Sequence, residues 1–394
     1  MKNIKLPDGW KIEKLCDLAI ISAGQGAPQK ESDYGDEGYP FIKVSNLEFL
    51  CNGGSEREIP KINNSIASDK KLRLYDKGTI IFAKSGMSCM KERVYALNES
   101  CYIVNHLACV TPKDINSKYL VYFLRKNPPT RLIKDLSYPS IRLSDIEKMK
   151  ITVPPLKTQK KIVEVLEKSE DTIKNRKEAI KLLDELVKSR FIEMFGSSED
   201  ATAMELNNIC LKITDGTHQS PQFVSAGVPF LFVSNIVNNK INYKTEKFIT
   251  REEYQLLIKR TPIEIGDVLL TIVGSYGNPA VVESAKEFCF QRHIAYIKPN
   301  KKQINSYYLH AALQTPYVRR QIDTRVKGIA QKTLNLSELK KIRINIPKIE
   351  KQNDFGRFYK QVDKLKFEME NSLKGLKDNF NSLMQKAFKG ELFN

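Results

Sequence analysis

Two halves of the 394-residue chain repeat the same order of short segments. GYPFIKVSNL at 38–47 returns as GVPFLFVSNI at 227–236, and LSDIEKMKITVPPLKTQ at 143–159 returns as LSELKKIRINIPKIEKQ at 336–352. The offsets between matched segments lie between 187 and 193 residues. A unit of about 190 residues is far longer than a solenoid repeat, so the pattern predicts two copies of a globular body.

Each copy has two parts that differ in their hydrophobic pattern. Roughly the first 150 residues mix short β-branched runs with Gly, Asn and Pro turns and a few short helices, which indicates a mixed α/β (α+β) domain. Roughly the last 40 residues form one helical pattern. We therefore predict a first domain at 1–153, a first long helix at 154–197, a second domain at 198–346 and a second long helix at 347–394.

The helical segments carry apolar residues at heptad spacing, with alternating steps of four and three residues. The alternative is that each helix folds back on its own domain, but a stripe of about two residues per heptad favours a narrow helix-to-helix contact. We predict an antiparallel coiled coil, roughly 55 Å long at 1.5 Å per residue. The predicted pairing residues are Ile162, Leu166, Ile173, Ile180, Leu183, Val187, Met194, Phe355, Val362, Met369, Leu376 and Leu383.

The repeated phrase at 143–159 marks the boundary between domain and helix. We interpret 143–153 as the closing strand of the first domain. Pro154 and Pro155 would stop this strand because proline lacks the backbone N–H of a ladder bond. Thr158 and Gln159 would then begin the helix.

The net charge of +18 is concentrated in the predicted domains, with +6 on residues 1–150 and +9 on residues 201–347. Two basic bodies of this size suit nucleic acid, although an acidic protein or a membrane face would also attract them. The longest apolar runs are strand-sized, well short of the roughly 20 residues that a membrane span needs. We expect a soluble, cytoplasmic protein with no membrane partner.

The seven cysteines contain no C-x-x-C pair and lie mostly in apolar, strand-like runs, which predicts buried thiols in a reducing compartment. Cys89, Cys101, His106 and Cys109 resemble a zinc set, but they lack paired ligand spacing, and core positions are the favoured interpretation. His106 and His293 recur at matched points of the two halves within alternating apolar runs. We interpret them as core or strand-end residues rather than general bases.

The sequence contains no constellation that argues for catalysis. NPPT at 127–130 resembles the N-P-P-aromatic motif of amino-methyltransferases, but Thr130 replaces the aromatic residue and no glycine-rich donor loop precedes it. Pro128 and Pro129 are better explained as ending a helix that starts near Ser117. Neither the clustered carboxylates of a nuclease nor a phosphate-binding P-loop is recognisable. We therefore predict no catalytic, cofactor or metal site on this chain.

In this arrangement the chain resembles the specificity subunit of type I restriction-modification systems. The segments that carry the resemblance are LPDGWKIEKLCDL at 6–18, PFIKVSNL, PFLFVSNI, the two boundary phrases and QKAFKGEL at 385–392. Together these segments cover the whole chain in the order typical of that family, and the order occurs twice. The second copy departs in two places: it has IPKIE where the first has VPPLK, and it begins AMELNNIC without the PDGW entry.

The resemblance implies a non-catalytic DNA-binding subunit with two target recognition domains. Each domain would read one half of a split, asymmetric site in double-stranded DNA, with the paired helices as a spacer. The helices and adjoining faces would dock two modification subunits, which carry the methyltransferase activity and its S-adenosylmethionine, and restriction subunits would join the full complex. The other interpretations are a coiled-coil scaffold that bridges protein partners, and the recognition module of another restriction enzyme class.

Segments that match between the halves should be scaffold, and segments that differ should read different half-sites. The divergent segments are 70–73, 84–93 and 137–142 in the first half, and 274–278 and 317–332 in the second. The predicted DNA-contacting residues are Lys70, Lys71, Arg73, Lys84, Ser85, Lys91, Arg93, Tyr138, Arg142, Ser275, Tyr276, Asn278, Arg319, Arg320, Arg325, Lys327, Gln331 and Lys332.

Segment 317–332 is the strongest candidate because it places five cations within 14 residues. Most such cations would contact phosphate, and Gln331 has the amide that pairs with the major-groove edge of adenine. The alternative is a solvated helix face followed by a flexible turn. Neutralising Arg319 and Arg320 together is expected to weaken binding and to flatten its salt dependence.

Overall fold

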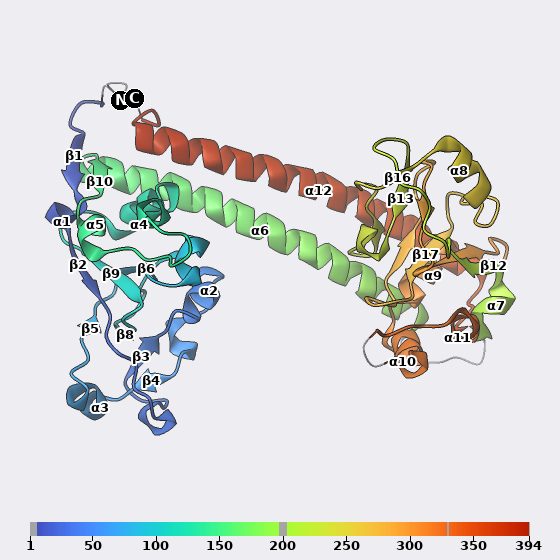
Figure 1. The fold of residues 1–394 in the computed structure, drawn as a ribbon, viewed down its shortest axis with the longest axis horizontal. Helices are drawn as coiled ribbons and strands as arrows, with labels where there is room; N and C mark the ends of the chain where they lie inside the picture. The colour runs from blue at the N-terminus through green and yellow to red at the C-terminus, as the bar shows by residue number, and fades with distance from the viewer. Residues whose placement is uncertain (1–5, 197–202, 329–330, 394) are drawn as a thin grey trace. The chain divides into compact units, whose positions relative to one another are not determined.

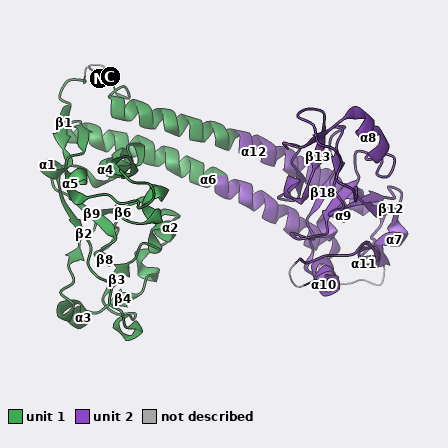
Figure 2. Ribbon diagram, viewed as in Figure 1, with its two compact units in different colours: residues 1–176, 372–394 green, residues 177–371 purple. Residues whose placement is uncertain are grey.

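The computed structural model of the protein describes residues 6–196, 203–328 and 331–393 (Figure 1). The chain divides into two compact units (Figure 2). Unit 1 is formed by Met1–Arg176 and Ser372–Asn394, and unit 2 by Lys177–Asn371. Each unit holds one mixed α/β domain together with a part of both long helices. The predicted start of the second domain, at residue 198, lies outside the described residues.

Unit 1 contains two four-stranded sheets. The first has the order β2-β9-β6-β7 with every neighbouring pair antiparallel, and the second has the order β4-β3-β8-β5 with β3 and β8 parallel. Strand β6 reads IIFA and is buried along its whole length, as expected of a strand covered on both faces. The strands are β2 (Ala19–Ala23), β3 (Tyr39–Ile42), β4 (Lys61–Ile62), β5 (Leu74–Tyr75), β6 (Ile80–Ala83), β7 (Val94–Ala96), β8 (Cys101–Ile103) and β9 (Leu107–Pro112).

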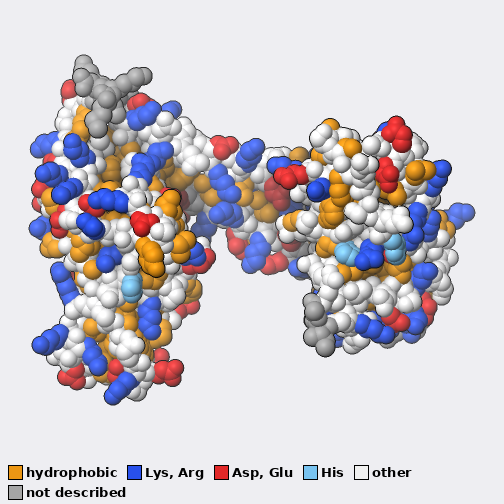
Figure 3. Space-filling model, in the orientation of Figure 1, with side chains coloured by type: hydrophobic (Ala, Val, Ile, Leu, Met, Phe, Trp, Pro, Cys, Tyr) orange, Lys and Arg blue, Asp and Glu red, His pale blue; other side chains and the backbone are white. Residues whose placement is uncertain are grey.

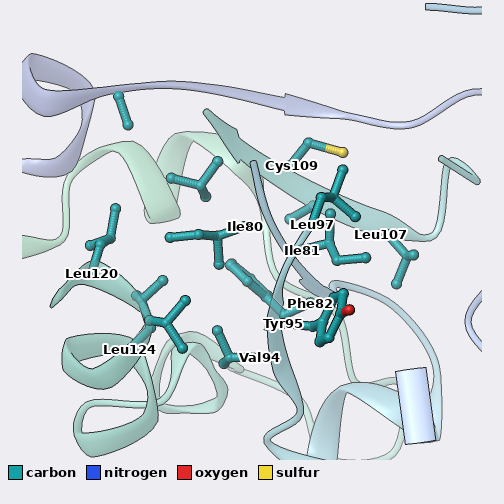
Figure 4. Close-up of a cluster of buried hydrophobic side chains, with 14 of the residues drawn as sticks. Ile80, Ile81, Phe82, Val94, Tyr95, Leu97, Leu107, Cys109, Leu120 and Leu124 are labelled. Carbon is teal, nitrogen blue, oxygen red and sulfur yellow. The ribbon is translucent and has the colours of Figure 1, made fainter. Parts of the chain in front are cut away.

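Short helices surround these sheets. The longest of them, α4 (Ser117–Lys126), ends before Pro128, as the sequence predicted. Its Leu120 and Leu124 belong to the same buried core as Ile80 of strand β6 (Figure 4). The remaining helices of the domain are α1 (Leu15–Leu18), α2 (Asn46–Cys51), α3 (Asn64–Asp69) and α5 (Leu143–Glu147), with 3-10 turns η1 (Glu31–Asp33), η2 (Glu56–Glu58), η3 (Met87–Lys91) and η4 (Pro129–Leu132).

Unit 2 repeats this plan. Its larger sheet has the antiparallel order β12-β20-β17-β18, and a smaller sheet has the order β16-β13-β19 with β13 and β19 parallel. The strands are β12 (Cys210–Asp215), β13 (Val228–Leu231), β14 (Ile236–Val237), β15 (Lys240–Ile241), β16 (Phe248–Ile249), β17 (Val268–Thr271), β18 (Pro279–Val281), β19 (Cys289–Phe290) and β20 (Ile294–Pro299). The short helices are α7 (Leu206–Ile209), η5 (Val233–Asn235), α8 (Arg251–Leu257), α9 (Ser306–Ala312), α10 (Pro316–Arg325) and α11 (Leu336–Lys340).

A two-stranded antiparallel pair joins the two ends of each domain. β1 (Lys11–Lys14) pairs with β10 (Lys150–Val153) in unit 1, and β11 (Met204–Glu205) pairs with β21 (Arg343–Ile344) in unit 2. Strands β10 and β21 each lie just before a long helix. Both long helices therefore leave the domain beside its first strand, and the duplication extends to this exit.

The long helices run antiparallel within unit 2. The ammonium of Lys351 lies 5.6 Å from the ring centre of Phe195, and Lys366 Nζ lies 2.5 Å from Asp184 Oδ1. Rising residue numbers along one helix therefore meet falling numbers along the other, as predicted. The two helices are α6 (Leu156–Phe195) and α12 (Ile349–Lys389), with 40 and 41 residues.

The ends of these helices also pack on the domains. In unit 1, Ile162 and Leu166 of α6 share the domain core with Met384 and Ala387 of α12. The sequence analysis treated a helix-to-helix contact and packing on the domain as alternatives. The same apolar stripe makes both contacts. Every residue predicted to pair is buried or half-buried. The heptad pattern missed Phe191, which is 6 % exposed.

Residues 143–153 do not form the single closing strand that the sequence analysis predicted. Residues Leu143–Glu147 form the short helix α5, because Leu143 and Ile146 are three residues apart and lie on one face, with Ile146 fully buried. The strand is confined to Lys150–Val153. Helix α6 then begins at Leu156, directly after Pro155, which is two residues after the predicted boundary at 154 and two residues before Thr158.

A buried glutamine holds the start of each long helix. Gln159 Oε1 accepts a hydrogen bond from the Asn116 amide, and its Nε2 donates to Pro154 O, both at 2.9 Å. Gln352, at the matched position, accepts from the Asn305 amide at 2.9 Å and donates to Pro347 O at 2.8 Å. These two residues are 2 % and 0 % exposed.

Four of the seven cysteines lie in strands, as the sequence predicted, but two others are exposed, which corrects the expectation that the thiols are buried. Cys16 and Cys51 lie in the short helices α1 and α2, and Cys89 is buried but lies in η3. Burial raises the pKa of the Cys101 and Cys109 thiols to about 12, which keeps them protonated. Among the described residues, no helix combines the length and apolarity that crossing a bilayer requires.

Candidate nucleic-acid interface

Three chain segments meet at one edge of unit 1 through main-chain hydrogen bonds. The Lys84 amide donates to His106 O at 3.0 Å, the Gly86 amide donates to Pro139 O at 2.9 Å, and the Ile141 amide donates to Lys84 O at 2.8 Å. We call residues 84–86, 105–107 and 139–141 the unit 1 junction. It brings together two segments that the sequence singled out separately, 84–93 and 137–142.

Unit 2 builds the same junction with other side chains. The Ile272 amide donates to His293 O, the Gly274 amide donates to Lys332 O, and the Leu334 amide donates to Ile272 O, at 2.9, 2.9 and 2.8 Å. Gly86 and Gly274 have φ values of 74° and 72°, a left-handed conformation that favours glycine. The unit 2 junction consists of residues 272–274, 292–294 and 332–334. The main chain is thus the constant part of this edge.

Several polar side chains at or beside the unit 1 junction are open to solvent at least in part. Ser85 Oγ lies 2.7 Å from His106 Nδ1. His106 is exposed at the turn between β8 and β9, so it is a strand-end residue and not a core residue. Tyr138 is 84 % exposed, Arg142 is exposed and Lys84 is half-buried. Two of the four predicted residues here, Tyr138 and Arg142, thus face solvent, and Lys84 and Ser85 are half-buried.

Gln25 positions the predicted cations of segment 70–73 and was missed by the sequence analysis. Its Nε2 donates to Lys71 O at 2.6 Å and its Oε1 accepts from the Arg73 amide. Lys71 has a φ of 53°, a conformation that needs such support in a residue with a side chain. Lys70, Lys71 and Arg73 are exposed. A glutamine after a strand gave no signal, because its partners lie more than 40 residues away.

The remaining cations of the first half differ in their partners. Lys91 ends η3 and is exposed. Arg93 Nη2 lies 2.8 Å from Glu48 Oε1, and its side chain is only 23 % exposed. Lys91 is thus open to a ligand, whereas Arg93 also links the start of β7 to helix α2.

In unit 2, Arg319 is engaged with the segment 274–278. Its Nη1 donates to Tyr276 O at 3.2 Å, its guanidinium lies 4.8 Å from the centre of the Tyr276 ring, and its Nε lies 3.1 Å from Asp323 Oδ1. Asp323 also accepts from Tyr276 Oη at 3.1 Å. Arg319 therefore fastens this turn to α10, which makes it a poor match for the free phosphate-binding cation that the sequence suggested.

The turn itself also has internal support. Asn278 Nδ2 donates to Ser275 O at 2.9 Å, and the Asn278 amide donates to Thr271 Oγ1 at 3.0 Å. Tyr276, bound on one side by Arg319 and on the other by Asp323, is half-buried. Ser275 is the exposed member of the predicted set in this turn.

In the rest of segment 317–332, one arginine is bonded within the protein and the other predicted residues are exposed to solvent. Arg325 Nη1 donates to Gln321 O at 3.0 Å, and its Nε lies 3.8 Å from Glu338 Oε2. Arg320, Lys327, Gln331 and Lys332 are exposed. Residues 329–330 of this segment lie outside the described residues.

The charge at the unit 2 junction comes from arginine and lysine. Burial and the neighbouring Arg292 lower the pKa of His293 below its ordinary value, so this imidazole is neutral at pH 7. Figure 3 shows Lys and Arg side chains close to histidine on the visible face of unit 2. Such a face suits a polyanion, and the donors on it suit groove edges as well as phosphates.

The metal set and the NPPT motif that the sequence analysis considered can be compared with the structure. Within the described ranges, no three His, Cys, Asp or Glu side chains are placed to share a metal ion. In the NPPT segment, Pro129 is buried and Asn127 Nδ2 donates to Phe123 O at 3.3 Å, so this asparagine ends helix α4.

Comparison with known proteins gives a consistent result. A family model described as the type I restriction modification DNA specificity domain matches residues 7–184 and 200–376. The chain is 30 % identical over 191 residues to the type I restriction enzyme MjaIX specificity subunit of Methanocaldococcus jannaschii, which covers 46 % of the chain and 42 % of that relative. The chain thus spans less than half the length of this relative in the match. The putative MjaX specificity subunit of the same organism is 25 % identical over 92 % of the chain and 88 % of its own length.

Solved structures show the same fold. A chain from a type I R-M system, in a study of its complex assembly and conformational transition, has a TM-score of 0.61 and 19 % identity over 98 % of this chain and 100 % of that chain. The S subunit of a type I restriction-modification system from M. genitalium has a TM-score of 0.57 and 15 % identity over 98 % of both chains.

Proposed function

The chain belongs to the family of type I restriction-modification DNA specificity subunits, and from this membership we propose that its two domains read the two halves of a split, asymmetric DNA target. The observation that carries this proposal is the junction built twice from equivalent main-chain bonds and lined by different side chains. One scaffold with two sets of side chains suits two different half-sites. Phosphate contacts would set the register, and base contacts would set the sequence.

The chain's partners in this proposal are two modification subunits, with restriction subunits in the full complex. Exposed apolar side chains on the long helices support docking there: Leu182 and Leu186 of α6 are 52 % and 47 % exposed, and Phe367 of α12 is 60 % exposed. Leu182 and Leu186 are four residues apart and so lie on one helix face. In this proposal, methyl transfer and S-adenosylmethionine belong to the modification subunits, and this chain only selects the site.

The long helices are proposed to act as a spacer between the two readers. At 1.5 Å per residue, the 40 residues of α6 extend over about 60 Å. Two half-sites one helical turn apart on a duplex are separated by about 34 to 36 Å. Helices of this length are thus long enough to set such a separation.

Mapping modified bases tests the proposal. When the chain is expressed with its modification subunits in a host without other methyltransferases, we expect methylation at one bipartite sequence. Changing side chains at the unit 1 junction should alter one half of that sequence and leave the other half and the gap unchanged. Methylation of a continuous site, or none that depends on this chain, would contradict the proposal.

Arg320 and Arg319 should behave differently when each is replaced by glutamine. Arg320 is exposed, so Arg320→Gln should weaken binding to all sequences roughly fivefold at 0.15 M salt and reduce the salt slope by about 0.9, as loss of one phosphate contact does. Arg319→Gln should instead loosen the turn at 274–278 and change the sequence preference. Filter binding across a salt series measures both, and equal salt slopes for Arg320→Gln and the native complex would contradict the assignment.

A further inference from the structure

A buried carboxylate at the end of β12 holds two side chains that could contact DNA, Arg260 and His218. Asp215 is 7 % exposed, and each of its oxygens has a partner. Oδ1 accepts from Arg260 Nη2, and Oδ2 accepts from His218 Nε2 at 2.9 Å. Arg260 Nε also donates to Asp215 O at 3.3 Å. The guanidinium is therefore fixed in direction by two separate acceptors of one residue.

The outer parts of this cluster open on a cavity. The cavity has a volume of about 310 Å³, and its lining includes Thr217, Leu256 and Phe290 beside the cluster. The side chains of His218 and Arg260 are 54 % and 51 % exposed. Their inner atoms thus bind the carboxylate while Arg260 Nη1 and His218 Nδ1 stay available to a ligand.

The cluster adjoins the unit 2 junction along the main chain. The Thr217 amide donates to Phe290 O at 3.1 Å, and the Arg292 amide donates to Thr217 O at 3.0 Å. Arg292 begins one of the three junction segments. The cluster and the junction therefore form one continuous edge of the domain.

Unit 1 holds cations at the equivalent place by another means. Gly24 and Gly216 match at the ends of β2 and β12, since their amides donate to Leu107 O and Ile294 O, both at 3.2 Å. In unit 1 the next residue is Gln25, which binds the loop after α3. In unit 2 the next residue is Thr217, which lines the same cavity as the loop after α8. Both units thus support a basic loop at the same edge, with different residues in each. Such a difference in residues is expected of two domains that recognise different DNA sequences.

We propose that Arg260, oriented by Asp215 and flanked by His218, reads a base edge in the half-site bound by unit 2. This inference rests on the proposed function. Asp215 cancels the charge of Arg260, so the cluster offers the directed donors of Arg260 without a net positive charge. Phosphate binding gains mainly from net charge, whereas recognition of a guanine edge needs an arginine fork held in one direction.

The test uses the complex of the full chain with its modification subunits and two DNA probes. One probe is a duplex carrying the methylation site found by mapping, and the other is the same duplex randomised in both half-sites. We expect Arg260→Gln and Arg260→Lys to lose about tenfold or more of the preference at one base pair of one half-site. Their salt slopes should match the native slope. Lysine keeps the charge but not the fork, so its agreement with glutamine is part of the expectation.

Arg251→Gln is the matched control. Arg251 is 57 % exposed and pairs with Glu287, but it does not line the cavity. Its replacement should leave the preference at every base pair unchanged. Thermal unfolding of each variant shows that folding is preserved, and Asp215→Asn should relax the same base pair if it folds.

The outcomes separate this inference from the proposed function. If the native complex binds no bipartite site, the proposed function fails. If the native complex binds its site and Arg260→Gln behaves as Arg251→Gln does, only this inference fails. A uniform loss over all sequences, with a salt slope smaller by about 0.9, would make Arg260 a phosphate contact and would also overturn it.

Discussion

Replacing Phe355 with alanine should lower the free energy of unfolding of unit 2 by about 3–5 kcal/mol. Phe355 is fully buried, and its ring centre lies 5.3 Å from that of Phe191 and 5.8 Å from that of Phe195. Both partners belong to α6, whereas Phe355 belongs to α12. The substitution removes the side chain on which the two helices and the domain core meet, and the surrounding rings can close the resulting space only in part.

Urea unfolding followed by circular dichroism measures this effect, and the matched control is Phe367→Ala. Phe367 lies on the same helix but is 60 % exposed, so its truncation should change the free energy of unfolding by less than about 0.5 kcal/mol. In thermal unfolding, Phe355→Ala should lower Tm by roughly 6–20 °C. A Phe355→Ala variant as stable as Phe367→Ala would show that the aromatic cluster does not hold the helices.

Replacing Gln352 with leucine should lower the free energy of unfolding of unit 2 by about 2–4 kcal/mol. Leucine is similar in size and apolar, but it leaves the Asn305 amide and the Pro347 carbonyl without their partner inside the protein. Gln303 O, which accepts from Gln352 Nε2 at 3.1 Å, loses its bond as well. Each buried polar group left without a partner costs about 1–3 kcal/mol.

The same substitution at Gln159 should have a similar effect on unit 1, because the pattern of bonds is repeated there. Gln361→Leu is the control, since Gln361 is exposed on α12 and its replacement changes no buried bond. Hydrogen exchange at the first turns of α6 and α12 locates the damage. Unchanged protection in both Gln→Leu variants would contradict the idea that these residues hold the helix starts.

The sequence predicted the features that local pattern determines. The duplication, the mixed domains and the two long helices follow from matched offsets and heptad spacing. Helix α5 was taken for a strand, because a segment of five residues such as Leu143–Glu147 carries too few apolar positions to separate a period of 2 from one of 3.6.

The candidate interface was predicted only in part. Divergence between the halves identified segments 84–93 and 137–142, which meet at the unit 1 junction. It could not tell that Arg319 is bound to Tyr276, because the two are 43 residues apart. It did not single out Arg260, which we propose as a reader, although the same comparison pointed to Lys71 in the equivalent loop of the first half.

The junction of each unit has a consequence for how such a protein can change over generations. Its segments are joined by amides and carbonyls, which every residue except proline supplies alike. Substitutions at Ser85, His106 or Ser140, and at the matched His293 and Thr333, therefore alter what the edge presents while its assembly is retained. If this edge reads DNA as proposed, substitutions there can change the target at little cost in folding, because the backbone that joins the segments is kept.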